Sequence, residues 1–209
     1  MTHTVHARIA GALVMIGFGS IGRGTLPLIE RHIGFDRGQF TVIEPSDEFA
    51  HLLHQRDIRH LQVALTAENF AEVLRPLFPE GRGMIVNLSV DVDSIELMKL
   101  AQEIGVQYID TVVEPWPGFY FGSTLPNAER TNYPLRERVR DLGKAYVGGP
   151  TAVSCCGANP GMVSWLLKEA LLRLAADTGV AADPRTREGW AGLMQGLGVK
   201  GIHIAERDT

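Results

Sequence analysis

The stretch Ala12-Leu13-Val14-Met15-Ile16-Gly17-Phe18-Gly19-Ser20-Ile21-Gly22 decides the fold of this chain. An apolar run typical of a buried strand leads into a G-x-G-x-x-G loop, and a helical pattern continues over Gly24–His32. In such a loop the first glycine permits a tight turn, the second lets the backbone approach a pyrophosphate, and the third lets helix and strand pack closely. The helix N-terminus adds free N–H groups and a partial positive charge. The stretch therefore predicts a dinucleotide-binding domain of the Rossmann type, with Gly17, Gly19, Ser20, Ile21 and Gly22 at the phosphates.

A carboxylate stands at the end of the second expected strand. At this position an acidic side chain accepts hydrogen bonds from the adenosine ribose hydroxyls and repels a 2′-phosphate. Glu44 therefore favours NAD over NADP as the cofactor. Arg23 weakens this preference, because a nearby arginine can serve the 2′-phosphate of NADP. The alternative interpretation of Glu44 is a solvated acid at a strand end.

Apolar runs typical of buried parallel strands alternate with helical patterns as far as Val113. The expected strands are Ala12–Ile16, Phe40–Glu44, Leu61–Leu65, Met84–Val90 and Tyr108–Val113. The expected helices between them are Gly24–His32, Asp47–Gln55, Ala67–Leu77 and Ser94–Ile104. This alternation predicts an α/β fold with a doubly wound parallel sheet and right-handed crossovers.

The pattern changes after Glu114, where a loop rich in proline, glycine and aromatic residues begins. Gly148-Gly149-Pro150 marks a boundary between an NAD-binding domain, residues 1–150, and the beginning of a second, truncated substrate domain, residues 151–209. The remaining elements expected are a helix at Leu135–Leu142, a helix at Met162–Ala176, and strands at Ala145–Val147, Ala152–Cys156 and Val199–Ile204.

Composition sets broad limits on function. The chain of 209 residues is 45% hydrophobic and 21% charged, with a formal net charge of −4, as in ordinary globular proteins. The charge gives no reason to expect nucleic acid or an anionic membrane as a partner, and no apolar run is long enough for a membrane span. Cys155 and Cys156 are adjacent, which disfavours a disulfide between them, so we expect reduced thiols in a cytoplasmic protein without a metal site.

Acidic residues follow the fourth and fifth expected strands. In an open α/β sheet, ligands bind outside the carboxyl ends of the strands, so Asp91, Glu114 and Trp116 should flank the nicotinamide end of the cofactor. Two carboxylates and an indole would form a cradle for an ammonium group. The alternative for Asp91 is that it caps the helix that follows. We expect Asp93 and Asp110 to be solvated or structural.

Four segments of the chain resemble bacterial homospermidine synthases, which are relatives of the saccharopine dehydrogenases. The segments are Val14–Gly24, Val86–Asp91, Tyr108–Trp116 and Ser154–Trp165. The resemblance continues to the terminal Gly201–Thr209. It implies a transferase of polyamine biosynthesis that carries out a redox-neutral aminobutyl transfer. In that reaction bound NAD takes a hydride from putrescine, the imine loses ammonia to a second amine, and the new Schiff base recovers the hydride to give homospermidine.

The resemblance also implies roles for individual residues. Asp91, Glu114, Asn159 and Glu206 would bind amines or move protons, and the alternative for Asn159 is to cap the helix after it. Expected partners are small diamines, putrescine with spermidine as a further candidate, and a second copy of the chain in a dimer. Family members continue well past residue 209, so cofactor binding without full activity is expected if the chain is the whole polypeptide.

Two other functions remain open. A saccharopine- or carboxynorspermidine-type dehydrogenase would carry out net reductive amination on a carboxylated substrate, which calls for arginine or lysine near the fifth strand. Glu114-Pro115-Trp116 stands there instead. A truncated NAD-binding module would bind the cofactor without chemistry.

Overall fold

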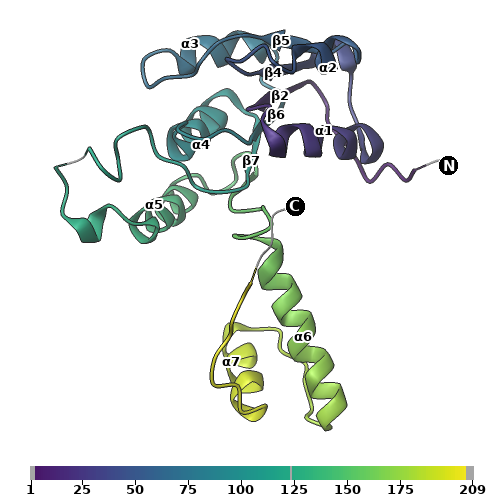
Figure 1. Cartoon of the computed structure of the whole chain (residues 1–209), viewed down its shortest axis with the longest axis vertical. Helices are drawn as coiled ribbons and strands as arrows, with labels where there is room; N and C mark the ends of the chain where they lie inside the picture. Colours follow the sequence, from purple (N-terminus) through teal and green to yellow (C-terminus); the bar gives the residue numbers. More distant parts are fainter. Residues whose placement is uncertain (1–2, 123, 206–209) are drawn as a thin grey trace. The chain divides into compact units, whose positions relative to one another are not determined.

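A computed structural model describes residues 3–122 and 124–205. The chain divides into two compact units, Met1–Gly157 and Ala158–Thr209, which are described separately (Figure 1). None of the helices in the described ranges is long and apolar enough to cross a bilayer.

The first unit is built on a six-stranded sheet in which every neighbouring pair of strands is parallel. Its strands, in spatial order, are β5 (Arg59–Leu61), β4 (Phe40–Ile43), β2 (Ala12–Ile16), β6 (Gly83–Asn87), β7 (Gln107–Asp110) and β8 (Ala152–Val153). The chain first moves outward from β2 to β4 and β5, then crosses to β6 on the other side of β2. The strand order therefore reverses at β2, and ligands of such sheets bind at this point, outside the carboxyl ends.

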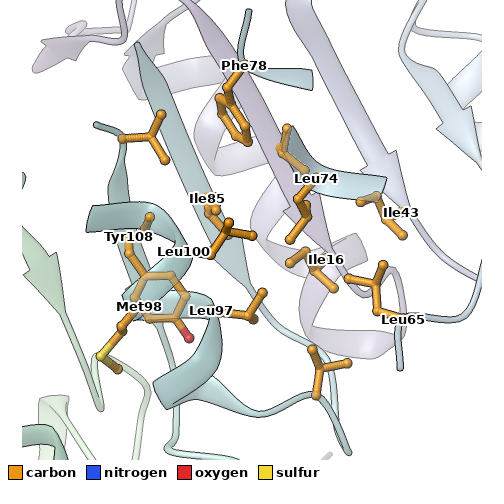
Figure 2. Packing of buried hydrophobic residues seen from close by; sticks show 14 of the residues in the cluster. Ile16, Ile43, Leu65, Leu74, Phe78, Ile85, Leu97, Met98, Leu100 and Tyr108 are labelled. Atoms are coloured by element: carbon orange, nitrogen blue, oxygen red, sulfur yellow. The ribbon is translucent and has the colours of Figure 1, made fainter. Parts of the chain in front are cut away.

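The central strand explains why helices cover both faces. All five residues of β2 are buried, and alternate side chains point to opposite faces of a strand. Leu13 and Met15 pack in one core with α1 (Ser20–His32) and α2 (Ala50–His54). Val14 and Ile16 pack in the other core with α3 (Phe70–Leu74) and α4 (Ser94–Ile104) (Figure 2). The sheet is therefore doubly wound, as the sequence predicted.

Capping fixes the ends of α4. The Asp93 carboxylate accepts hydrogen bonds from the backbone N–H groups of Ile95 and Glu96, at 2.9 and 3.0 Å. Gly105 ends the helix in the left-handed region, at φ 80°, where glycine has no steric penalty. Asp93 is thus structural, one of the two roles expected for it.

Smaller elements complete the first unit. β1 (Ala7–Arg8) pairs with β3 (Ile33–Gly34) in a separate two-stranded sheet. The last long helix is α5 (Asn132–Ala145), whose Leu135 packs with Ile95 and Val113. Short 3₁₀ turns lie at η1 (Arg37–Gln39), η2 (Arg75–Leu77) and η3 (Asn127–Glu129).

The second unit, as far as it is described, contains a pair of helices. These are α6 (Met162–Thr178) and α7 (Arg187–Gly196). Leu171, Ala175 and Leu193 form its buried core. The side chains of Trp165 and Trp190 both lie near Lys168, whose Nζ is 4.7 and 5.3 Å from their ring centroids.

Several expected elements differ from the structure. The third strand is Arg59–Leu61 rather than Leu61–Leu65, and residues 145–147 end a helix and begin a turn instead of forming a strand. The strand expected over Val199–Ile204 is absent from the described residues, and α7 was not predicted. The division of the chain follows Gly157 rather than residue 150, because β8 pairs with β7 and so belongs to the first unit.

The cap on α4 can be tested by substitution. Asp93→Ala should destabilise the protein by about 1 kcal/mol, because two N–H groups at the helix start lose their acceptor. Asp93→Asn should keep most of the stability, since an amide oxygen caps nearly as well as a carboxylate. Thermal melts followed by circular dichroism compare the two variants. Equal melting temperatures for Asp93→Ala and the unchanged chain would contradict the assignment.

Candidate active site

A cavity of about 460 Å³ opens at the carboxyl ends of the central strands. Its wall combines the glycine loop, the end of β4, the segment after β5 and the loop between β6 and α4. The lining residues are Ile16, Gly17, Gly19, Ser20, Ile21, Ile43, Glu44, Pro45, Val63, Ala64, Leu65, Leu88, Ser89, Val90, Asp91, Val92 and Pro117. The cavity therefore lies where the strand order reverses, the position expected for a ligand of this fold.

The glycine loop fits a dinucleotide pyrophosphate. Gly17 has φ 91°, and a Cβ on it would lie 2.8 Å from the backbone N of Ser89. A Cβ on Gly22 would lie 2.5 Å from the carbonyl O of Gly17. A Cβ on Gly19 would meet nothing within 4 Å, so this is the open side of the loop. Among the described residues no side chain caps the first turn of α1, which leaves its N–H groups available to an anion.

Glu44 lies in the cavity wall and also binds the loop. One carboxylate oxygen accepts a hydrogen bond from the N–H of Phe18 at 2.7 Å, and the other accepts one from the N–H of Ser46 at 3.0 Å. Glu44 is therefore not a freely solvated acid. The guanidinium carbon of Arg23 lies 3.7 Å from the centroid of the Phe49 ring, so Arg23 makes a cation–π contact with Phe49.

Asp91 is an exposed cavity residue and does not cap α4. The capping alternative is wrong because Asp93 supplies both hydrogen bonds to the helix start. The backbone of Asp91 has φ 60°, a conformation that residues other than glycine adopt at some cost. Within the described ranges, no group donates a hydrogen bond to its carboxylate. Asp91 is thus a carboxylate held at the cavity without a structural duty that explains its position.

Glu114 is fixed beside Asp91 through its backbone. Its N–H donates to the hydroxyl of Ser94 at 3.0 Å, and its carbonyl accepts from the N–H of Ser94 at 2.8 Å. Partial burial raises the pKa of the Glu114 carboxyl above its ordinary 4.5, and the negative charges of Asp91 and Asp110 raise the pKa further. The two acids therefore share one electrostatic environment beyond the carboxyl ends of β6 and β7, and their position beside the nicotinamide stays a prediction.

The structure does not place Trp116 in the cavity. Its indole is half-buried against the core of the first unit, with its centroid 5.6 Å from the ring of Phe70, and the cavity is lined instead by Pro117. The large apolar surface of an indole favours this packing over exposure to a polar cleft. Trp116 thus lies outside the cavity wall, and its contact with substrate stays a prediction.

The other two acid–base candidates lie elsewhere. Asn159 is an exposed residue of the second unit. It does not cap α6, because the N-cap position is Gly161 and no side chain accepts a hydrogen bond there. Glu206 lies outside the residues that the structure describes.

Some residues that shape the site were not predicted from the sequence. Ser94 holds the backbone of Glu114, and Val63, Ala64 and Leu65 line the cavity as a loop instead of forming a strand. Asp110 is 1% exposed and accepts hydrogen bonds from three residues, which makes it structural but far from solvated. The position of Asp110 directly after the apolar run Tyr108-Ile109 could have indicated that its carboxylate is buried.

Comparison with known proteins places the chain in a family. The family model described as the saccharopine dehydrogenase NADP binding domain matches residues 13–153. The chain belongs to this family. The matched region covers the glycine loop and all six strands from β2 to β8 in the sheet described above.

Individual relatives are more specific. The chain is 60% identical to a homospermidine synthase of Blastochloris viridis and 56% identical to one of Mesorhizobium japonicum, over 98% of this chain in each case. It spans less than half of those relatives, 44% and 43% of their lengths. A crystal structure of the homospermidine synthase of Legionella pneumophila in complex with NAD matches 90% of this chain and 39% of its own chain. The TM-score is 0.78 and the identity 29%.

Alanine substitutions in the loop should separate folding from binding. Gly19→Ala should leave the melting temperature unchanged but weaken dinucleotide binding by about tenfold or more, because its methyl group occupies the space for the pyrophosphate. Gly22→Ala should also lower the melting temperature, because its Cβ collides with the carbonyl of Gly17.

Titration calorimetry with NAD and NADP and a thermal melt provide the two measurements. Gly24→Ala is the control, since its Cβ also meets nothing within 4 Å and it lies in α1 beyond the cavity wall. Equal binding by the Gly19 and Gly24 variants would show that the loop does not approach the phosphates.

The raised pKa of Glu114 predicts a pH-dependent stability difference. Because the folded state binds this proton more tightly than the unfolded state, ionisation of Glu114 costs stability as the pH rises through its folded pKa. Glu114→Gln should therefore melt at a higher temperature than the unchanged chain near neutral pH. The difference should vanish below the ordinary pKa of 4.5, where both states are protonated. Glu68→Gln is a control of opposite sign, because a hydrogen bond from Thr66 lowers the pKa of Glu68.

Proposed function

We propose that this chain forms the cofactor-binding and amine-binding part of a homospermidine synthase that uses NAD. The reaction is a redox-neutral aminobutyl transfer from one putrescine to another, with release of ammonia. The names of the relatives that are 56–60% identical over 98% of the chain support this choice. The NAD complex of the Legionella pneumophila enzyme supports the cofactor.

The observation that carries the proposal is the placement of Asp91. Asp91 lines the same cavity as the glycine loop, and it is not needed as a helix cap because Asp93 caps α4. A free carboxylate next to the dinucleotide site suits a substrate that carries ammonium groups, because a charge-assisted hydrogen bond is among the stronger polar contacts. Glu114 adds a second acid to the same environment.

The two acids are assigned different tasks. Asp91 binds an ammonium group of the diamine and orients its chain toward the cofactor. Glu114, whose pKa is raised by burial and by its acidic neighbours, exchanges a proton at its carboxyl oxygen with the substrate nitrogen. The glycine loop, with Gly17, Gly19 and Gly22, would hold NAD, which would supply a hydride acceptor beside the donor carbon. Asn159 and Glu206 complete the proposed set of catalytic residues.

Glu44 supports NAD over NADP. Its carboxylate lies in the cavity wall, where it would face the adenosine ribose and repel a 2′-phosphate. Arg23, the residue that could serve NADP, is stacked on Phe49.

The cavity wall disfavours the dehydrogenase alternative. A carboxylated substrate calls for a cationic partner, and none of the cavity residues in the described part of the chain is arginine or lysine.

We further propose a cytoplasmic dimer. The free thiols of Cys155 and Cys156 support the reducing compartment, and sedimentation analysis tests the dimer.

Products formed from putrescine and NAD test the function. The protein should form homospermidine without net NADH, as measured by mass spectrometry and absorbance. Asp91→Asn and Glu114→Gln should each lower this rate by about a hundredfold or more, the usual effect of losing a general acid or an essential charged contact. Both variants should still bind NAD, because neither residue belongs to the glycine loop.

Asp57→Asn is a matched control. Asp57 is also an exposed aspartate with positive φ, 55°, but it lies outside the cavity wall. Net accumulation of NADH with putrescine would favour the dehydrogenase instead. NAD binding without any product from the diamine, in the protein with its natural ends, would favour a binding module.

A further inference from the structure

A row of buried polar groups crosses the sheet next to the cavity. The amide nitrogen of Asn87, at the end of β6, donates to the hydroxyl oxygen of Tyr108 in β7 at 3.2 Å. The Tyr108 hydroxyl in turn donates to the Asp110 carboxylate at 3.0 Å. Exposure is 2% for Asn87 and 1% for both Tyr108 and Asp110. Figure 2 shows Tyr108 among the apolar side chains of the core that contains α4.

One end of this row reaches the cavity wall. The hydroxyl of Ser89 donates to the amide oxygen of Asn87 at 2.6 Å, and the N–H of Ser89 donates to the same oxygen at 3.3 Å. Ser89 lines the cavity, and its backbone N is an atom that a side chain on Gly17 would strike. The position of Ser89 therefore sets the space left for the turn of the glycine loop.

The other end holds the segment that leaves β8. The Asp110 carboxylate accepts hydrogen bonds from the N–H of Cys155 at 2.7 Å and the hydroxyl of Ser154 at 2.9 Å. Cys155 has φ 59°, a conformation that is strained for a residue with a side chain, and the contacts with Asp110 hold it there. The backbone N–H of Cys156 also donates to the Asp110 carbonyl at 2.9 Å. This segment is the covalent connection to the second unit, which begins at Ala158.

We propose that Asp110 is a positioning residue that ties the Ser154–Cys156 connection, through Tyr108, Asn87 and Ser89, to the cavity wall beside the glycine loop. The proposal rests on the function proposed above only where it concerns turnover. A change at the Ser154–Cys156 connection then alters the affinity of the dinucleotide site. Dinucleotide binding in return slows hydrogen exchange at the connection.

The chemistry of the row supports a positioning role. Burying a carboxylate is costly unless it is hydrogen-bonded, and within the described part of the chain no arginine or lysine pairs with Asp110. Burial raises the pKa of its carboxyl, while the hydrogen bonds from Cys155, Ser154 and Tyr108 oppose the rise. An apolar side chain at the end of β7 would avoid this cost but would hold neither Cys155 nor Tyr108.

Two conservative changes test the row at residues outside the cavity wall. Ser154→Ala removes a donor to Asp110, and Ser154→Thr keeps the hydroxyl. Tyr108→Phe removes the central link with little change in volume, and Tyr133→Phe is its exposed control, 65% accessible. Hydrogen exchange of the segments 87–91 and 153–157, NAD titration and thermal melts are measured for each variant.

The expected result is coupling at a distance. Ser154→Ala and Tyr108→Phe should speed exchange at both segments and weaken NAD binding by about fivefold, the usual size of coupling through packed networks. Ser154→Thr should restore binding, and Tyr133→Phe should change nothing. At saturating NAD, turnover of putrescine should show a lower kcat with an unchanged KM for the diamine.

Two outcomes would overturn the proposal. In the first, faster exchange after Ser154→Ala stays confined to 153–157 and NAD binding is unchanged. In the second, NAD affinity falls only in proportion to a general loss of stability, and Ser154→Thr binds NAD as weakly as Ser154→Ala does. Exchange and NAD titration need no turnover, so absence of homospermidine would count against the proposed function and leave this inference standing.

Discussion

The close approach of two backbone segments governs this structure. Gly17, at the end of β2, passes so near Leu88 and Ser89 that a single added carbon would lie within 3 Å of both. The register of β2 against β6, which pairs Ile16 with Asn87, brings these segments together, and the N–H of Leu88 donates to the carbonyl of Ile16 at 2.8 Å. The loop can then turn sharply into α1 and present its N–H groups to the cavity. The proposed site depends on this close approach of the two segments, because it sets how far the phosphate-binding loop lies from Asp91 and Glu114.

The two acids beyond β6 and β7 sit in places that cost stability. Asp91 adopts a positive φ, and Glu114 is partly buried beside two other negative charges. Neither carboxylate holds these segments in place, since Asp93 caps α4, and the hydroxyl and N–H of Ser94 bind only the backbone of Glu114. Costs that the surrounding structure enforces tend to occur at functional sites. In the first unit, Asp93 and Ser94 therefore stabilise the carboxyl edge of the sheet, and Asp91 and Glu114 remain available for the proposed chemistry.

Periodicity and local motifs were enough to predict much of this. The β-α alternation, the glycine loop, the helix Ser94–Ile104 and the placement of Asp91 and Glu114 at one edge follow from patterns within short windows. Predictions failed where tertiary contacts decide. Leu65 was predicted to end a strand because it is apolar. It is buried, but it lies in the loop after β5. Trp116 packs against the ring of Phe70, which is distant in sequence, and lies outside the cavity wall, so its predicted contact with substrate stays a prediction. Asp93 caps α4 although the sequence suggested capping only for Asp91, two residues earlier, and the pattern of residue types does not distinguish the two positions.

The hydrogen bond from Phe18 to Glu44 has a thermodynamic consequence. It forms between protein groups alone, with the carboxylate drawing the turn toward β4 at 2.7 Å and a second contact to Ser46 restraining the acid itself. The turn is therefore held by groups of the protein itself, through these two contacts of Glu44. Loops that must be ordered by their ligand lose affinity to that ordering, whereas a preorganised one does not. Association at this loop should therefore proceed with little loss of chain entropy, and its heat should reflect mainly the new contacts to the phosphates.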